Sequence, residues 1–132
     1  MANVIPNSFR GSLFSAHHDF ASGGNTFKLA LYTAGSGAPY STSSTVYTSG
    51  TANQVGTSGT GYSTGGKALT SQAVASTTAV ASVDFADVEW TTATFGAAYG
   101  VIYNSSSVDG AADRLVVVLD FGGTKTCTNG TF

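Results

Sequence analysis

Apolar and polar residues alternate along several stretches of the chain, and this period of two predicts β-strands. The first such stretch covers residues 26–33, in which Phe27, Leu29 and Leu31 share one face. The intervening side chains share the other face, because successive residues of a strand point to opposite sides. The pattern predicts a half-buried strand here.

The second half of the chain repeats this signal. In residues 78–90, a β-bulge near Ala86–Asp87 would bring two apolar pairs onto one face: Val83 with Phe85, and Val88 with Trp90. Residues 95–103 alternate regularly, and residues 115–119 are apolar on both faces, which predicts a central strand. The polar residues 104–112 predict a turn between these last two strands.

Gly-rich turns separate these strands, and no helices alternate with them. This arrangement predicts an all-β fold, either an antiparallel β-sandwich or a barrel-like sheet. A length of 132 residues favours one domain over residues 1–132. The predicted core consists of apolar side chains on strand faces: Phe27, Leu29, Leu31, Val83, Phe85, Val101, Leu115, Val117 and Leu119.

An N-terminal segment, residues 1–25, precedes the first strand. The apolar side chains of Phe9, Leu13 and Phe14 are spaced so that they fall on one face of a helix. Polar residues just before them can cap that helix. We therefore predict a short helix over residues 7–18.

Residues 33–66 are dominated by Gly, Ser and Thr. A segment this long with little regular pattern predicts an extended surface excursion with one or two short strands. It has too few apolar residues to form its own core, yet it contains Tyr40, Tyr47 and Tyr62. Because tyrosines are enriched in protein interfaces, we expect these three to contact other subunits.

Charged residues make up only 9% of the chain, against about 25% in ordinary proteins, and the net charge is -2. Five Lys and Arg residues spread along the chain give no basic patch for a phosphate backbone, so no nucleic-acid partner is expected. No apolar run approaches the roughly 20 residues of a membrane span, and the first residues lack the pattern of a signal peptide. We therefore expect no membrane partner. The single cysteine, Cys127, excludes an intrachain disulfide.

Two motifs of enzyme sites overlap in the segment Gly61–Lys67. It matches the first part of a P-loop, but Ala68 stands where Ser or Thr would bind magnesium, and no helix is predicted to follow. It also matches GxSxG around Ser63, but both histidines precede this serine, whereas the motif needs a later one. We interpret the segment as a Gly-rich turn that enters a strand.

His17, His18 and Asp19 form the one cluster with metal-ligand chemistry. Adjacent side chains diverge on a helix or a strand, so two neighbouring histidines rarely reach one ion. We interpret the cluster as a helix C-terminus, where a histidine favours the negative end of the dipole, or His17 as a packed core residue. No metal site is expected.

Three acids, Asp84, Asp87 and Glu89, lie close together in sequence. On a strand, Asp87 and Glu89 would share a face about 7 Å apart, a spacing that paired acids use in glycoside hydrolysis. The same spacing is common on solvated strand faces, and ionised acids are mostly exposed. We therefore predict an exposed acidic face, no catalytic residues, no cofactor and no enzymatic activity.

Five short phrases occur in order along the chain: FKLALYT (27–33), GTGYSTGGK (59–67), VDFADVEW (83–90), VIYN (101–104) and LDFGG (119–123). With them, nearly the whole chain resembles a widespread family of small virion structural proteins of tailed bacteriophages. The resemblance implies a non-enzymatic capsid decoration, or cement, protein on the head surface that binds the major capsid protein. Family members continue through another strand after the equivalent of Thr131–Phe132, which implies that the last strand is truncated here or supplied from elsewhere.

The decoration role predicts a homo-oligomer, with a trimer as the first expectation. We expect residues 1–20 and the excursion 33–66 to contact other subunits. The predicted contact residues are Phe9, Leu13, Phe14, Tyr40, Tyr47 and Tyr62. Two alternatives stay open: a tail or fibre protein whose exposed tyrosines recognise a host glycan, and a small hydrolase that uses the acids of residues 84–89.

Overall fold

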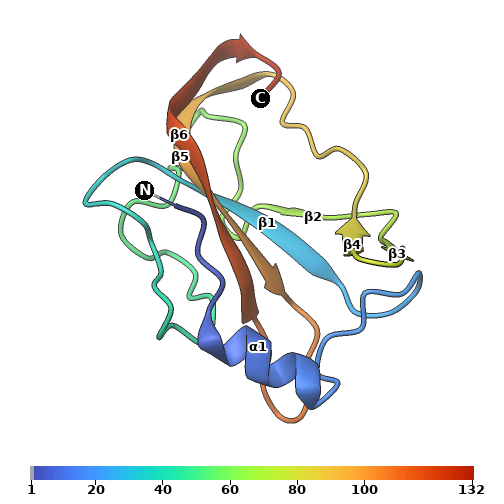
Figure 1. Cartoon of the computed structure of the whole chain (residues 1–132). Helices are drawn as coiled ribbons and strands as arrows, with labels where there is room; N and C mark the ends of the chain where they lie inside the picture. Colours follow the sequence, from blue (N-terminus) through green and yellow to red (C-terminus); the bar gives the residue numbers. More distant parts are fainter. Residues whose placement is uncertain (1) are drawn as a thin grey trace.

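A computed structural model describes residues 2–132 of the chain. Figure 1 shows one short helix beside long, bent strands, and the antiparallel all-β class is confirmed; the sheet does not close into a barrel. The elements are α1 (Asn7–Phe14), β1 (Phe27–Tyr32), β2 (Lys67–Ala68), β3 (Ala73–Ser76), β4 (Ala81–Asp84), β5 (Ala93–Asn104) and β6 (Arg114–Gly130).

Four strands form the main sheet, in the order β2-β1-β5-β6, and β3 pairs with β4 in a separate hairpin. Strands β5 and β6 form a long antiparallel ribbon with register shifts, such as the one between Ala97 and Tyr99, that let it bend. The ribbon's turn coincides with the predicted polar turn. β6 is an edge strand, so the prediction of a central strand at residues 115–119 is wrong. Beyond β5 it forms two isolated bridges: Val118 exchanges two backbone hydrogen bonds with Val4, and Arg114 pairs with Val46.

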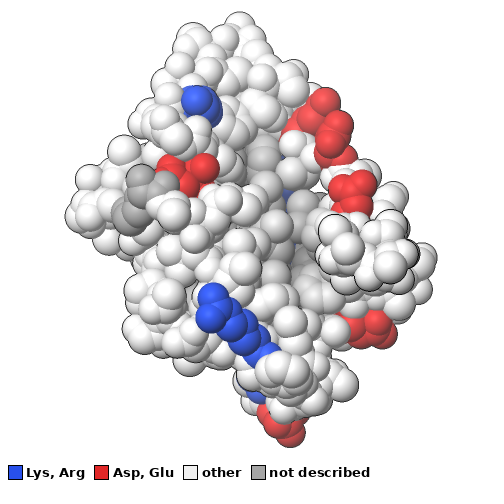
Figure 2. Space-filling view, in the orientation of Figure 1, with Lys and Arg blue, Asp and Glu red and all other residues white. Residues whose placement is uncertain are grey.

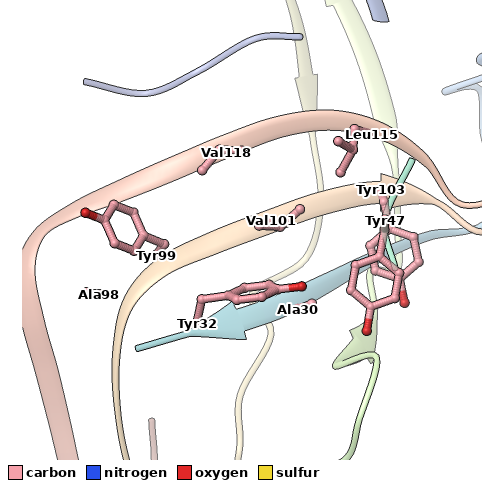
Figure 3. Close-up of a cluster of buried hydrophobic side chains, with 9 residues drawn as sticks. All are labelled: Ala30, Tyr32, Tyr47, Ala98, Tyr99, Val101, Tyr103, Leu115 and Val118. Carbon is pink, nitrogen blue, oxygen red and sulfur yellow. The ribbon is translucent and has the colours of Figure 1, made fainter. Parts of the chain in front are cut away.

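Strand β1 is packed on both faces. Residues 33–66 fold back over the face that carries Ala30 and Tyr32. Ala30 and Tyr32 have no exposed area, so the prediction of a half-buried strand is wrong. Tyr47 stacks on Tyr103 with 4.1 Å between ring centres and 7° between planes, and Figure 3 shows the two rings side by side. The excursion is therefore a covering layer of the core, and aromatic side chains that were predicted to contact other subunits hold it in place.

The opposite face of the sheet is covered by the N-terminal segment and by residues 69–90. Phe20 stacks on Phe27 with ring centres 4.3 Å apart, and Leu69 and Val116 are buried beside them. Near the far end of the β5–β6 ribbon, Trp90 exchanges backbone hydrogen bonds of 3.0 and 2.9 Å with Phe132. Apolar residues on both faces of β6 thus reflect two covered faces and not a central position.

The predicted core is correct for four of its members: Phe27, Leu31, Val101 and Leu115 are buried. Val83 is 42% exposed, because only Ala81–Asp84 of the predicted strand 78–90 is extended, and it lies in the separate hairpin. The other four predicted members are partly buried: Leu29, Phe85, Val117 and Leu119.

Helix α1 is shorter than the predicted helix over residues 7–18. It ends at Phe14, and Ala16 adopts a left-handed φ of 56° that an α-helix does not continue through. Its N-cap is Pro6 in an extended conformation with no side-chain cap, so the predicted polar cap is not used. The remaining residues 15–26 run as a loop to β1.

Candidate functional site

An apolar groove opens between α1, the β5–β6 ribbon and the β3–β4 hairpin. Figure 2 shows a hollow between the body of the molecule and the lobe on the right, where Figure 1 places β3 and β4. The groove has a volume of about 360 Å³. Its lining consists only of apolar side chains: Phe9, Leu13, Phe20, Val83, Phe85, Ile102, Val116 and Val117.

Three exposed apolar side chains lie on α1 or just before it. Phe14 is 94% exposed, Leu13 is 47% exposed and also lines the groove, and Ile5 just before the helix is 43% exposed. The helix ends at Phe14, so its ring has no following turn to pack against. Together these residues and the groove form the apolar surface of α1, the name we use for it below.

A buried polar cluster fixes the N-terminal segment to the end of β5. The Asn104 side chain has no exposed area, and its Nδ2 donates to Asn25 Oδ1 (2.9 Å) and to His18 Nδ1 (3.2 Å). Its Oδ1 accepts from the backbone N–H of Ser106 (3.0 Å), which fixes the orientation of the amide. His18 Nδ1 must therefore accept, and its proton lies on Nε2.

Two effects keep His18 neutral in this cluster. Burial first, and then the nearby positive charges of Arg114 and His17, together lower the pKa of His18 from 6.5 to about 4. His18 packs against Phe9 with ring centres 4.9 Å apart, and His17 Nε2 lies 3.4 Å from the Asp109 carboxylate. The interpretation of His17 as a packed core residue is not borne out, since His17 is only partly buried and His18 is the buried histidine; the interpretation as a helix C-terminus is wrong because α1 ends before the cluster.

No metal-binding arrangement is present among residues 2–132, since no three His, Cys, Asp or Glu side chains come together there. Over the same residues, no helix is long and apolar enough to cross a membrane.

The Gly61–Lys67 segment is a turn that enters β2, as its interpretation predicted. Gly66 has a φ of +75°, and a Cβ there would lie 1.8 Å from the backbone oxygen of Leu29, so only glycine lets β2 approach β1. The Lys67 ammonium donates to the Glu89 carbonyl and lies 5.9 Å from the centre of the Trp90 ring. This lysine is therefore held against the protein surface instead of standing free over a phosphate site.

The remaining candidates for chemistry are not assembled into a site. Ser63 is exposed, while His18 is bonded to Asn104 and His17 lies beside Asp109. Asp84, Asp87 and Glu89 are all exposed, and Asp84 Oδ1 accepts from the backbone N–H of Phe85. Figure 2 shows charged side chains as separate spots on a mostly uncharged face.

Two of the three tyrosines predicted to contact other subunits lie in the chain's own core. Tyr47 is 6% exposed and Tyr62 is 3% exposed, and Gln54 Nε2 lies 3.0 Å from both hydroxyl oxygens. The Tyr62 hydroxyl also accepts from the backbone N–H of Leu31 (3.1 Å). Their burial contradicts their prediction as contact residues: Tyr47 stacks on Tyr103, and Tyr62 packs with Leu31 and Trp90, so residues 33–66 fold against their own chain.

The other predicted contact residues are at or near the surface. Phe14 and Leu13 are exposed, Phe9 is partly buried in the groove, and Tyr40 is partly buried with its hydroxyl 3.3 Å from that of Tyr32. Neither the groove nor the burial of Asn104 was predicted from the sequence. The end of the 95–104 stretch indicates both: Ile102 makes the second face of this strand apolar, and Asn104 is the polar residue that ends the apolar run.

Comparison with known proteins gives no match: no protein family model, no curated protein and no solved structure is similar to this chain.

Proposed function

We propose that this chain is a non-enzymatic structural protein of a tailed-phage virion, which binds the major capsid protein on the head surface as a decoration or cement protein. The five sequence phrases support the phage origin through the resemblance that they carry. The apolar surface of α1 supports the binding role.

The observation that carries the proposal is this apolar surface. Soluble proteins rarely expose contiguous apolar patches unless the patch binds a partner. Phe14 is 94% exposed, and Leu13, its neighbour in sequence, lines a groove with apolar lining alone. A small-molecule site would add a few polar groups that orient the ligand, and the lining contains none, which favours a protein surface as partner.

The low charge of the chain fits the same role. Crowded copies on a shell repel one another less when each has a net charge close to zero, and here it is -2. Self-association and a virion location belong to this proposal. The glycan-binding alternative, in which a tail or fibre protein uses exposed tyrosines, loses support because Tyr47 and Tyr62 are buried.

The experiment is a binding assay between the purified chain and capsids of the phage that encodes it. Phe14→Asp places a charge on the exposed ring position and should weaken capsid binding at least about tenfold, since aromatic anchors often contribute more than 1.4 kcal/mol. Val46→Asp is the matched control: Val46 is 40% exposed on the excursion, and this variant should bind as the wild type does.

Two results would contradict the proposal at different levels. If Val46→Asp alone loses binding, the contact lies on residues 33–66 and not on α1. If the wild-type chain binds no capsids, the decoration role itself is wrong.

A further inference from the structure

The β3–β4 hairpin stands outside the main sheet and has both faces exposed. All eight strand residues of Ala73–Ser76 and Ala81–Asp84 are exposed, including Val74 (58%) and Val83 (42%). A hairpin of two strands is only marginally stable in water by itself, and added strands stabilise it. The hairpin is therefore a candidate for pairing with another chain.

The backbone of the hairpin shows which groups are free to pair. Thr77 N donates to Val80 O (2.8 Å), so the N–H of residue 77 points inward, toward the partner strand. Along an antiparallel ladder, inward and outward groups alternate. With the register Val74↔Val83 and Ser76↔Ala81, these four residues point their N–H and C=O groups away from the hairpin.

Strand β4 borders the apolar groove through one side chain. Val83 of β4 lines that groove together with residues of β5, β6 and α1. On the other side, Gln72 just before β3 donates to the carbonyl oxygens of Ala21 (2.7 Å) and Asn25 (3.0 Å), which ties the start of β3 to a loop. An added strand thus has a free backbone edge at β4 and an apolar surface beside it.

The two short strands of the hairpin contain a single charged residue, Asp84 at the end of β4. Residues 73–83 contain no Lys, no other charged residue, no Pro and no Gly. Charges, prolines and bulges are the usual protection of exposed edges. Their absence from residues 73–83 suits an edge that is covered in the assembled protein.

We propose that β4 pairs with β4 of a second copy of this chain, antiparallel across a two-fold axis. With the axis at Ser82, Ala81 lies opposite Val83 of the partner subunit, and Val83 lies opposite Ala81 of the partner subunit. Outward-pointing groups then meet at both positions, so each pair exchanges two backbone hydrogen bonds. The two hairpins become one four-stranded sheet in the order β3-β4-β4-β3.

The absence of charge at Ala81–Val83, the residues next to the proposed axis, suits a second copy as the partner. A two-fold axis places equivalent strands against each other, so a charge near the axis would meet a like charge. The nearest charge is Asp84, which in this register lies opposite Val80 of the partner subunit. The two Asp84 side chains are then four residues apart, about 13 Å, which exceeds the screening length of about 10 Å at 0.1 M salt. This inference does not depend on the virion role.

Residue-resolved amide hydrogen exchange of the wild-type chain over a dilution series tests the pairing directly. The amides of Ala81 and Val83 should gain protection as concentration rises, while those of Val74 and Ser76 on the β3 edge should stay fast. Protection of the β3 amides instead, or equal rates at all four positions at every concentration, would overturn the proposal.

Two proline variants give an independent test by light scattering. Val83→Pro removes an outward N–H that the hairpin itself does not use, and the dimer should become a monomer. Val74→Pro is the matched control on the β3 edge and should remain dimeric. Pairing through β4 would be contradicted if light scattering gave the wild-type chain the mass of a monomer or a trimer. It would also be contradicted if the Val83→Pro variant remained a dimer.

Discussion

Replacing Asn104 by alanine tests the buried polar cluster that anchors the N-terminal segment. The side chain has no exposed area and makes three hydrogen bonds of 2.9–3.2 Å, to Asn25, His18 and Ser106. Asn104→Ala removes all three at once. A fourth, longer contact of 3.4 Å to the His17 carbonyl is lost with them.

The expected magnitude follows from what happens to the three partners. Each neutral hydrogen bond contributes about 1 kcal/mol net, and a buried partner left without a bond costs more. Asn25 and Ser106 are partly exposed and can bond to water, whereas His18 is 9% exposed. We therefore expect a loss of about 3 kcal/mol in the free energy of unfolding.

Urea unfolding followed by circular dichroism measures this loss. Ser105→Ala is the matched control on the neighbouring residue: it removes one exposed hydrogen bond, to Thr26 O at 3.0 Å, and should cost no more than about 0.5 kcal/mol. A loss below about 1 kcal/mol for Asn104→Ala would refute the view that the cluster anchors the segment.

Three further predictions rest on burial and pKa, and a fourth concerns the Gly61–Lys67 segment. Leu115→Ala should cost about 2–5 kcal/mol of unfolding free energy and Val83→Ala less than about 0.5, because Leu115 is 1% exposed and Val83 is 42% exposed; equal losses would contradict the assigned core. Because the pKa of His18 falls to about 4 in the folded chain from 6.5, its contribution to stability is complete above pH 6.5 and is lost as pH falls toward 4; a His18→Gln variant whose stability falls as steeply over this range would contradict it. Burial raises the pKa of four of the six tyrosines, so an ultraviolet titration at alkaline pH should show these four ionising only as the chain unfolds; ionisation of all six in the folded chain would exclude the buried aromatic layer. ATP with magnesium should leave the melting temperature unchanged, and a rise of several degrees would reopen the Gly61–Lys67 segment as a phosphate site.

The sequence predicts the strands best where alternation is regular and long. β1 and β5 follow from the period of two at residues 26–33 and 95–103, and the turn after Asn104 follows from its polar residues. At residues 78–90 the pattern misleads, because an apolar residue such as Val83 carries no information about which sheet its strand joins.

The candidate site was less predictable because its features depend on contacts between distant segments. Tyr47 and Tyr62 are of a residue type that is common in interfaces. They are buried in the core because residues 33–66 fold back against the sheet. In the sequence, Asn104 is an ordinary polar residue at a strand end. Its partners His18 and Asn25 are both about 80 positions away, so only the folded chain shows that they bond to it. Phe14 was predicted as a contact residue, and its exposure is in keeping with that prediction.

The copy number of this chain in purified virions is the most direct test of its proposed role. Quantitative mass spectrometry of particles from the phage that encodes it would compare the chain with the major capsid protein. A decoration protein should be present in many copies, in a fixed ratio to the shell subunits. A small set of copies with the symmetry of the tail, or no chain in the particle at all, would contradict the account.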